Sequence, residues 1–303
     1  LFAKWAKEFR SFSEGSKGLM LACSGGLDST VLFHLLCEFL KGHKNFKLRI
    51  CHINFGLRAK ESEDDEKFVR TLAKKNGIEI IVYKLTLSTH PKAPGESLQA
   101  WARRQRYIKF AELARAGWII ALAHHLNDLA ENVLFRLARG TSPSSLLGMK
   151  SVNLPYWRPL LEVDKNCLKD FVSRHNLLHR EDSSNAKLIY ARNRIRHEVL
   201  PVFESLAPGA AKRMVRLAKQ ASELADFSYD KLVAENLDKG DLTKRAKEHF
   251  EVICSKKRFA SLSEGVALEF LARKLGWRQK KRKSLSYKFL KDVFIQAHTN
   301  QGT

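Results

Sequence analysis

The chain is poor in the features that mark membrane and secreted proteins. No stretch approaches the ~18 uninterrupted apolar residues that a transmembrane helix needs. The N-terminal segment LFAKWAKEFRSF mixes charged with apolar residues, so it lacks the apolar centre of a secretory signal. The five cysteines form no C-x-x-C pair and no disulfide spacing, which is typical of a reducing compartment. We therefore expect a cytoplasmic protein without a membrane partner.

Acidic residues are also few relative to basic ones. The chain has 54 Lys and Arg residues against 32 Asp and Glu residues, which gives a formal net charge of +22. Such an excess favours a polyanionic partner, because each phosphate that a protein neutralises releases counterions. The sequence therefore predicts binding to nucleic acid, with a basic but unspecialised surface as the alternative.

The first two hundred residues alternate short apolar segments with segments of helical periodicity. This alternation predicts an α/β fold, in which a parallel sheet carries helices on both faces. The predicted strands are 18–25, 47–55, 78–85 and 118–125, and the predicted helices between them are 29–42, 62–77 and 97–117.

The pattern changes after about residue 205. A Pro-Gly pair opens one long amphipathic helix, on which Lys212, Arg216 and Lys219 share a face. We therefore expect an α/β domain over 1–207 and a smaller, mostly helical domain over 208–303. The basic run RQKKRK at 278–283 is either a solvated surface or a contact with nucleic acid. The sequence leaves open whether a further C-terminal domain has been removed, and whether the protein is a monomer or a homodimer.

A glycine loop follows the first predicted strand. Ser24, Gly25 and Gly26 precede a helix that carries Asp28 in its first turn. Two glycines let the backbone approach a ligand, and the amides and dipole of a helix N-terminus attract phosphate. The loop matches neither G-x-x-x-x-G-K-[ST] nor G-x-G-x-x-G. It predicts a phosphate site, with a plain turn as the alternative.

A second polar group follows the fourth predicted strand. At helical spacing, His124, Asp128 and Glu131 face one way and lie at the same edge of the sheet as the glycine loop. A metal site and a solvated helix start are both open. A site for an amine fits better, because carboxylates attract an ammonium group and one of them can take its proton.

The segment SGGLDS, residues 24–29, resembles the pyrophosphate loop of the N-type ATP pyrophosphatases, which have an adenine nucleotide α-hydrolase-like fold. Several families share that loop. Other motifs, in the same order, resemble those of the tRNA(Ile)-lysidine synthetase family. They are CHINFGLRAKESEDDEKFV, SLQAWARRQRYIKF, AHHLNDLAENV, RPLLEV and REDSSNAKLIYARNRIRHEVLP.

The resemblance implies a function. The family uses ATP to join the ε-amine of free L-lysine to C2 of the wobble cytidine of tRNA(Ile) with a CAU anticodon, through an adenylated intermediate. The modified tRNA reads AUA instead of AUG, and the helical remainder is expected to bind tRNA. The implied residues for ATP are Ser24, Gly25, Gly26, Leu27, Asp28, Ser29 and His52, with Mg²⁺ on Asp28. Those implied for catalysis are Asp28, Asp128, Glu131, Arg103 and Arg196, and those for substrate are Asp128, Glu131, Arg106 and Arg192.

The chain departs from the family pattern at four positions. They are Asn127, where the family usually has aspartate, and Phe55, Leu129 and Asn132, where it has His, Gln and Thr. These departures leave two alternatives. One is another ATP pyrophosphatase that modifies tRNA by thiolation, against which the missing C-x-x-C pair argues. The other is a relative that binds tRNA without turnover.

Overall fold

The structure is a computed structural model, and it describes residues 1–303 apart from 44–45, 182–190, 237–243, 246–249, 252–262 and 277–303. The chain divides into two compact units. The first comprises Leu1–Leu129 and Met149–Asn193, and the second comprises Ala130–Gly148 and Arg194–Thr303. The expected boundary between residues 207 and 208 is a simpler division, and it stays a prediction.

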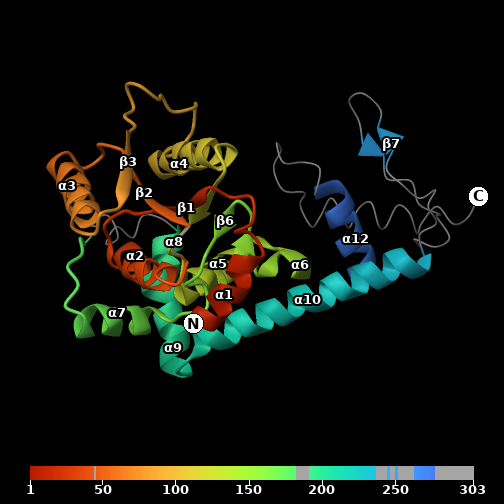
Figure 1. Ribbon diagram of the computed structural model, residues 1–303. Helices are drawn as coiled ribbons and strands as arrows, with labels where there is room; N and C mark the ends of the chain where they lie inside the picture. Colours follow the sequence, from red (N-terminus) through yellow and green to blue (C-terminus); the bar gives the residue numbers. More distant parts are fainter. Residues whose placement is uncertain (44–45, 182–190, 237–243, 246–249, 252–262, 277–303) are drawn as a thin grey trace, which may run out of the picture. The chain divides into compact units, whose positions relative to one another are not determined.

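A six-stranded sheet forms the centre of the first unit (Figure 1). Its strand order is β3-β2-β1-β4-β6-β5, and all neighbours are parallel except β5 and β6. The strands are β1 (Gly18–Ala22), β2 (Lys47–Asn54), β3 (Glu79–Lys84), β4 (Trp118–Ala121), β5 (Val152–Asn153) and β6 (Tyr156–Trp157). This arrangement confirms the predicted α/β fold.

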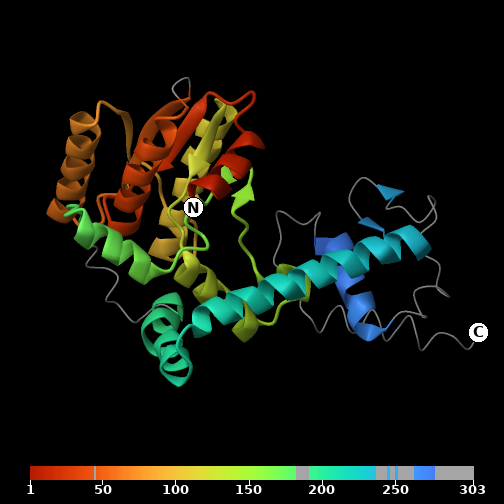
Figure 2. The same ribbon diagram turned by 60° about the horizontal axis from the view of Figure 1, so that its bottom comes forward.

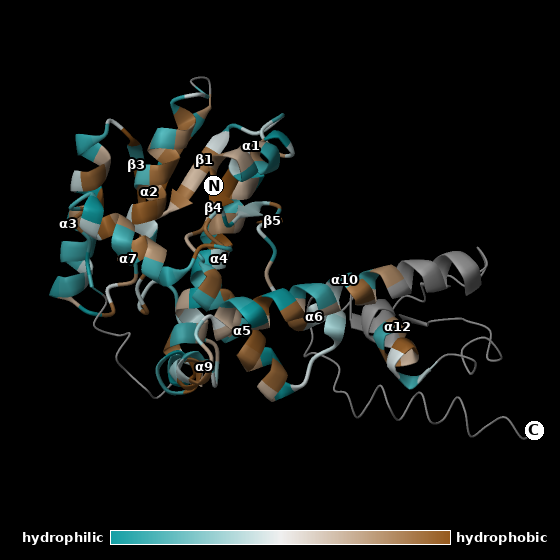
Figure 3. Cartoon of the chain, turned by 90° about the horizontal axis from the view of Figure 1, so that it is seen from below, coloured by the Kyte–Doolittle hydropathy of each residue, from teal (hydrophilic) through white to brown (hydrophobic). Residues whose placement is uncertain are grey.

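Helices cover both faces of this sheet. Leu19 and Leu21 of β1 pack into a core with α1, α2, α3 and α7, whereas Met20 between them packs with α4 on the opposite face. A strand that is buried on both faces is apolar at every position, and Figure 3 accordingly shows β1 and β4 in brown. These helices are α1 (Phe2–Arg10), α2 (Leu27–Leu40), α3 (Lys60–Lys75), α4 (Leu98–Arg115) and α7 (Lys165–Arg174).

The four strands and three helices expected from the sequence are confirmed as β1 to β4 and α2 to α4. Four further elements of the sheet and its helix layers were not predicted, namely α1, α7, β5 and β6. The Trp5 indole of α1 donates a hydrogen bond to the Pro159 carbonyl (2.9 Å), and the Trp157 indole of β6 donates to Glu8 (2.8 Å). These contacts join segments that are distant in sequence. For α1 a local signal was present, because Phe2, Trp5 and Phe9 are spaced for one face of a helix.

Gly18 at the start of β1 allows a close approach of two neighbouring strands. A Cβ atom at this position would lie 2.3 Å from the Lys47 carbonyl oxygen and 2.9 Å from the Trp118 ring. We expect Gly18→Ala to lower the free energy of unfolding by about 2–3 kcal/mol, because backbone must shift. Urea denaturation measures the change. Gly77→Ala is the control, because Gly77 also has a positive φ but a Cβ there meets nothing within 4 Å, so this variant shows the cost of the positive φ alone. Equal losses in both variants would contradict the steric explanation.

Helix α5 (Leu126–Arg139) belongs to the first unit up to Leu129 and to the second unit from Ala130. In the second unit, α10 (Ala210–Asn236) is one uninterrupted helix (Figures 1 and 2), which confirms the predicted long helix. Its Lys212, Arg216 and Lys219 are exposed. The other elements are α6 (Pro143–Leu146), α8 (Ala191–Arg194), the π-helix η2 (Ile195–Val199), α9 (Leu200–Leu206), β7 (Lys244–Arg245), β8 (Phe250–Glu251) and α12 (Glu264–Gly276).

The basic run at 278–283 lies outside the described residues, as do residues 182–190 of the motif REDSSNAKLIYARNRIRHEVLP. Among the helices that the structure describes, none combines the length and the apolar character needed to cross a membrane.

Candidate functional site

The glycine loop joins β1 to α2, and its own hydroxyl groups shape it. The Ser24 hydroxyl accepts a hydrogen bond from the Gly26 amide (3.3 Å) and lies 3.2 Å from the Ser29 hydroxyl. Ser29 in turn donates to the Gly26 carbonyl (3.0 Å). Gly26 is the N-cap of α2 and brings no side-chain acceptor to the first-turn amides, which begin at Leu27. These amides and the dipole of α2 are therefore available to an anion, as the sequence predicts.

Gly25 has a backbone conformation that other residues rarely adopt. Its φ is +88°, and a Cβ atom there would lie 3.2 Å from both Phe68 and Val69 of α3. Its carbonyl accepts hydrogen bonds from the Arg180 amide (2.9 Å) and the Thr30 hydroxyl (3.2 Å). The loop thus needs glycine at this position both for its φ and for its approach to α3.

Asp28 in the first turn of α2 already has a cationic partner. The Lys165 ammonium group at the start of α7 lies 2.5 Å from Asp28 Oδ1, and His125 Nε2 lies 3.7 Å from Asp28 Oδ2. Neither Lys165 nor His125 was predicted from the sequence. Lys165 follows the RPLLEV motif 137 residues after Asp28, and no local signal marks it.

His125 brings the glycine loop and the second polar group together. Its Nε2 lies 3.7 Å from Asp28 and 3.5 Å from Asp128, and its backbone N–H donates to the Asp128 carboxylate (3.1 Å). Asp128 is the third residue of α5, from which a side chain can reach back to the amide just before the helix. His124, which was expected on the helix face, instead precedes α5.

Asp128 is buried and ionised. Burial on its own would raise the pKa of Asp128, but the imidazoles of His125 and His124 and the guanidinium of Arg192, 3.4 Å away, together hold that pKa below its usual value. A carboxylate that keeps its charge suits the binding of an ammonium group better than the removal of its proton.

Glu131 and Arg196 form a close ion pair within the second unit. Arg196 Nε and Nη2 donate to the two carboxylate oxygens of Glu131 at 2.6 and 3.2 Å. The Glu131 side chain is only 1% exposed, whereas that of Arg196 is 34% exposed. Arg196 lies on η2, a π-helical turn of a kind that is frequent at functional sites. Two residues that the sequence singled out separately are thus bound to each other.

The remaining predicted residues lie on or near the sheet. Arg103 and Arg106 are exposed on α4, where Arg103 stacks over the Tyr107 ring (4.8 Å) and Arg106 over the Phe55 ring (5.7 Å). His52 is buried, and its Nδ1 lies 2.9 Å from the Cys23 carbonyl directly before the glycine loop. His52 therefore contacts the backbone that leads into the glycine loop, and its contact with ATP stays a prediction.

The four departures from the family pattern have structural partners in this chain. Asn127 accepts a hydrogen bond from the Lys165 amide (3.0 Å), and Asn132 donates to the Leu147 carbonyl (3.3 Å). Leu129 is buried, and the Phe55 ring packs edge-on against a tryptophan ring 5.6 Å away. Each substituted side chain thus packs or bonds in place.

The donor set fits a Mg²⁺ ion that is shared with phosphates. Mg²⁺ in nucleotide sites is commonly held by one or two carboxylates together with the substrate's phosphate oxygens. Asp28, next to the glycine loop, supplies one such carboxylate. In the described part of the chain, no group of three or more His, Cys, Asp or Glu residues could hold a metal ion without a substrate.

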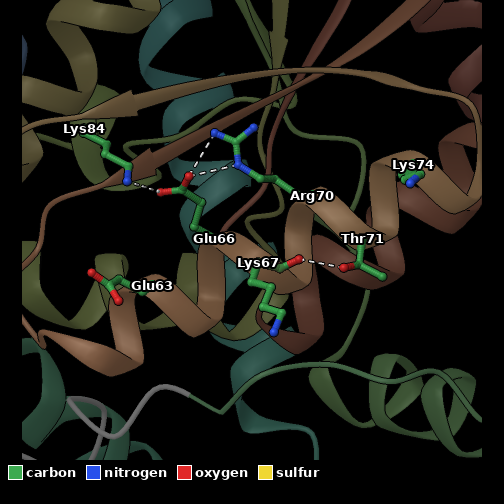
Figure 4. A pocket seen from close by; sticks show the side chains of 7 residues that line it. All are labelled: Glu63, Glu66, Lys67, Arg70, Thr71, Lys74 and Lys84. Atoms are coloured by element: carbon green, nitrogen blue, oxygen red, sulfur yellow. Dashed lines mark hydrogen bonds and ion pairs between the residues drawn. The ribbon is translucent and has the colours of Figure 1, made fainter.

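A hollow of about 340 Å³ is lined by residues of α3 and by Lys84 at the end of β3 (Figure 4). Glu66 projects into it and is bonded to Arg70 (2.9 Å) and Lys84 (3.7 Å), so its carboxylate is already neutralised. Burial on its own would raise the pKa of Glu66, but hydrogen bonds from Asn54 and Arg70, together with the charges of Lys84 and Arg70, lower it. This hollow brings together no reactive group, and the candidate site is the polar edge of the sheet.

The pKa of His124 makes the stability of the fold depend on pH. Burial, aided by nearby arginines, lowers this pKa from 6.5 to about 4. The folded chain therefore resists a proton that the unfolded chain takes up below pH 6.5, so stability is full above that pH and falls as the pH drops towards 4. The loss is at most about 3 kcal/mol. Urea denaturation at pH 7.5 and pH 5 is expected to show a smaller drop for His124→Asn than for the unmodified chain, and equal drops would contradict a buried neutral imidazole.

Comparison with known proteins gives the family. The PP-loop domain family matches residues 2–203. The tRNA(Ile)-lysidine synthase of Petrotoga mobilis is 34% identical over 218 residues, which cover 71% of this chain and 69% of that protein. The chain belongs to the tRNA(Ile)-lysidine synthase family of PP-loop proteins. The resemblance that the sequence motifs carry is thereby confirmed.

Two further relatives describe the extent of the similarity. The tRNA(Ile)-lysidine synthase of Thermosipho africanus is 34% identical over 239 residues, which cover 78% of this chain and 55% of that protein. This chain spans about half the length of several curated lysidine synthases that it matches. Among solved structures, the U34-tRNA thiolase NcsA from Methanococcus maripaludis, with its [4Fe-4S] cluster, has a TM-score of 0.58 and 18% identity over 73% of this chain and 80% of that one. That likeness shows the PP-loop fold alone.

Proposed function

We propose that this chain joins free L-lysine to the wobble cytidine of tRNA(Ile) with a CAU anticodon, with ATP cleaved to AMP and pyrophosphate. The single observation that carries the proposal is the position of His125, whose Nε2 lies 3.7 Å from Asp28 and 3.5 Å from Asp128. A phosphate loop and a carboxylate that can bind an amine therefore share one edge of the sheet. Membership of the lysidine synthase family supports the same substrates.

The first step activates the base. The C2 oxygen of cytosine is a poor leaving group, so it attacks the α-phosphate of ATP, forms a bond to phosphorus and expels pyrophosphate. The glycine-loop amides and the hydroxyl groups of Ser24 and Ser29 bind phosphate oxygens, and Asp28 is the carboxylate that would hold Mg²⁺. When bound, Mg²⁺ supplies positive charge to the departing pyrophosphate. The exposed arginines Arg103 and Arg106 add positive charge for phosphate or RNA.

The second step forms the new carbon–nitrogen bond. The ε-amine of lysine attacks C2 of the adenylated base, and AMP leaves with the C2 oxygen. The ionised Asp128, with Arg192 beside it, orients the ammonium group, which loses its proton to solvent before the attack, and Glu131, held by Arg196, fixes the amine. The product tRNA reads AUA instead of AUG. In this proposal Asp128 contributes orientation more than basicity, because its pKa is lowered.

The net charge of +22 and the exposed basic face of α10 support binding to tRNA. Thiolation of tRNA has less support, because the cysteines form no C-x-x-C pair. The departures at Asn127, Leu129 and Phe55 favoured the alternative of a relative that binds tRNA without turnover. Each of these side chains is bonded or packed in this chain, so the departures give that alternative less support.

The experiment that tests the proposal measures AMP and pyrophosphate release from ATP. The chain is incubated with Mg²⁺ and tRNA(Ile) of CAU anticodon, with and without lysine, and with a tRNA of different anticodon as control. We expect AMP release that needs both the correct tRNA and lysine. Bound tRNA with intact ATP would instead identify a tRNA-binding protein without turnover.

A further inference from the structure

Lys165 lies at the phosphate loop although no motif or family assignment marks it. Its ammonium group is 2.5 Å from Asp28 Oδ1, and the two side chains are 28% and 31% exposed. Asp28 stands in the first turn of α2, directly after the glycine loop. A cation of this chain is therefore already present where the phosphates of ATP are expected to bind.

The backbone that carries Lys165 is held in place from two sides. The Asn127 side chain accepts a hydrogen bond from the Lys165 amide (3.0 Å), and the Asp164 side chain caps α7 by accepting from the Asn166 amide (2.7 Å). The Leu126 amide donates to the Val163 carbonyl (2.9 Å), which joins the starts of α5 and α7. The position of the Cα atom is thus fixed, whereas the four-carbon side chain keeps its freedom to turn.

The pair is partly exposed, so it contributes little to stability and can be exchanged at low cost. An ion such as Mg²⁺ on Asp28 would compete with the ammonium group for the same carboxylate oxygens. The ammonium group, displaced by at most the length of its own side chain, would then meet the polyphosphate that arrives with the metal ion. Lysine is suited to such a contact, since its charge is compact and its three donors are not bound to one plane.

We propose that Lys165 is a mobile phosphate-binding residue. In the nucleotide-free chain it neutralises Asp28, and when Mg²⁺ and ATP occupy the loop it turns to the phosphate chain and neutralises the pyrophosphate portion. This inference rests on the proposed use of ATP, but not on the identity of the tRNA or of the amine. The inference also assigns a positioning role to Asn127, because its side chain accepts the hydrogen bond that holds the start of α7 next to the loop.

The test measures binding rather than turnover, on the full chain. Isothermal titration with AMP and with α,β-methylene-ATP, in the presence of Mg²⁺, compares the unmodified chain with Lys165→Met, Lys165→Arg and Lys169→Met. Lys169 is an exposed residue one turn further along α7, so its variant is the matched control. We expect Lys165→Met to lower the affinity for α,β-methylene-ATP by about ten- to a hundred-fold, and to change the affinity for AMP by no more than about three-fold. The Arg and Lys169 variants are expected to stay near the unmodified chain.

The outcomes separate this inference from the proposed function. If the unmodified chain binds the analogue and Lys165→Met binds it equally well, the inference is wrong and the proposed function stands. If Lys165→Met lowers the affinity for AMP and for the analogue to the same extent, Lys165 is structural and the inference is again wrong. If the unmodified chain binds no analogue, both fail. If Lys165→Met does not fold, a second experiment on the unmodified chain replaces it. An amine-reactive reagent labels the lysines, and we expect the analogue with Mg²⁺ to slow labelling of Lys165 relative to Lys169. Unchanged labelling would contradict the inference.

Discussion

Replacing Asp128 with asparagine is expected to lower kcat/KM for lysine by about a thousand-fold, because a buried carboxylate that binds an ammonium group is lost. Asparagine keeps an oxygen that can accept the hydrogen bond from the His125 amide, so the start of α5 is expected to stay intact. Asp128 acts in the amine step, and tRNA-dependent pyrophosphate release in a single turnover is therefore expected to persist. Rates of AMP formation against lysine concentration measure the effect.

Asp170→Asn is the matched control, since Asp170 is an exposed carboxylate on α7 outside the site. It is expected to leave the lysine dependence unchanged. An Asp128→Asn chain that keeps its kcat/KM for lysine would remove Asp128 from the amine site. A variant that loses pyrophosphate release as well would move Asp128 to the activation step.

Replacing Arg196 with methionine is expected to lower the free energy of unfolding by about 3–5 kcal/mol, because it removes the guanidinium from a buried carboxylate. Glu131 is 1% exposed and is bonded to Arg196 through both of its oxygens. Urea denaturation of the full chain measures the loss. Arg194→Met is the matched control, because Arg194 pairs with the exposed Glu198 in the same segment and is expected to cost less than about 1 kcal/mol.

A double variant separates charge from packing. Adding Glu131→Gln to Arg196→Met removes the uncompensated charge, and part of the lost stability is expected to return. If Arg196→Met costs no more than Arg194→Met, the ion pair is not a stabilising element, and the close contact with Glu131 would have to serve the substrate alone.

The glycine loop could be predicted from the sequence because its determinants are local. Ser24, Gly25 and Gly26 act through their own backbone and through Ser29, only a few residues away. Strands β1 to β4 and helices α2 to α4 were predictable for the same reason, since apolar runs and helical periodicity repeat within each segment. The positions of Asp28 and Asp128 followed from the rule that the carboxyl ends of parallel strands share one edge.

The partners of these side chains could not be predicted in the same way. Lys165 reaches Asp28 across 137 residues, and Arg196 reaches Glu131 across 65. Which of two adjacent histidines faces Asp128 depends on the residue at which α5 begins, and periodicity fixes such a boundary poorly. The direction of the Asp128 pKa shift depends on the sum of opposing effects, namely burial and the nearby imidazoles and guanidinium, which only coordinates supply.

The central claim is that this chain forms lysidine on tRNA. Its most direct test is nucleoside mass spectrometry of tRNA(Ile) with a CAU anticodon after incubation with the chain, ATP, Mg²⁺ and isotopically labelled lysine. The account predicts that the wobble cytidine gains the label of one lysine, and that the gain is lost in Asp128→Asn. Unlabelled tRNA, under conditions in which a lysidine synthase of known activity modifies the same molecule, would contradict the account.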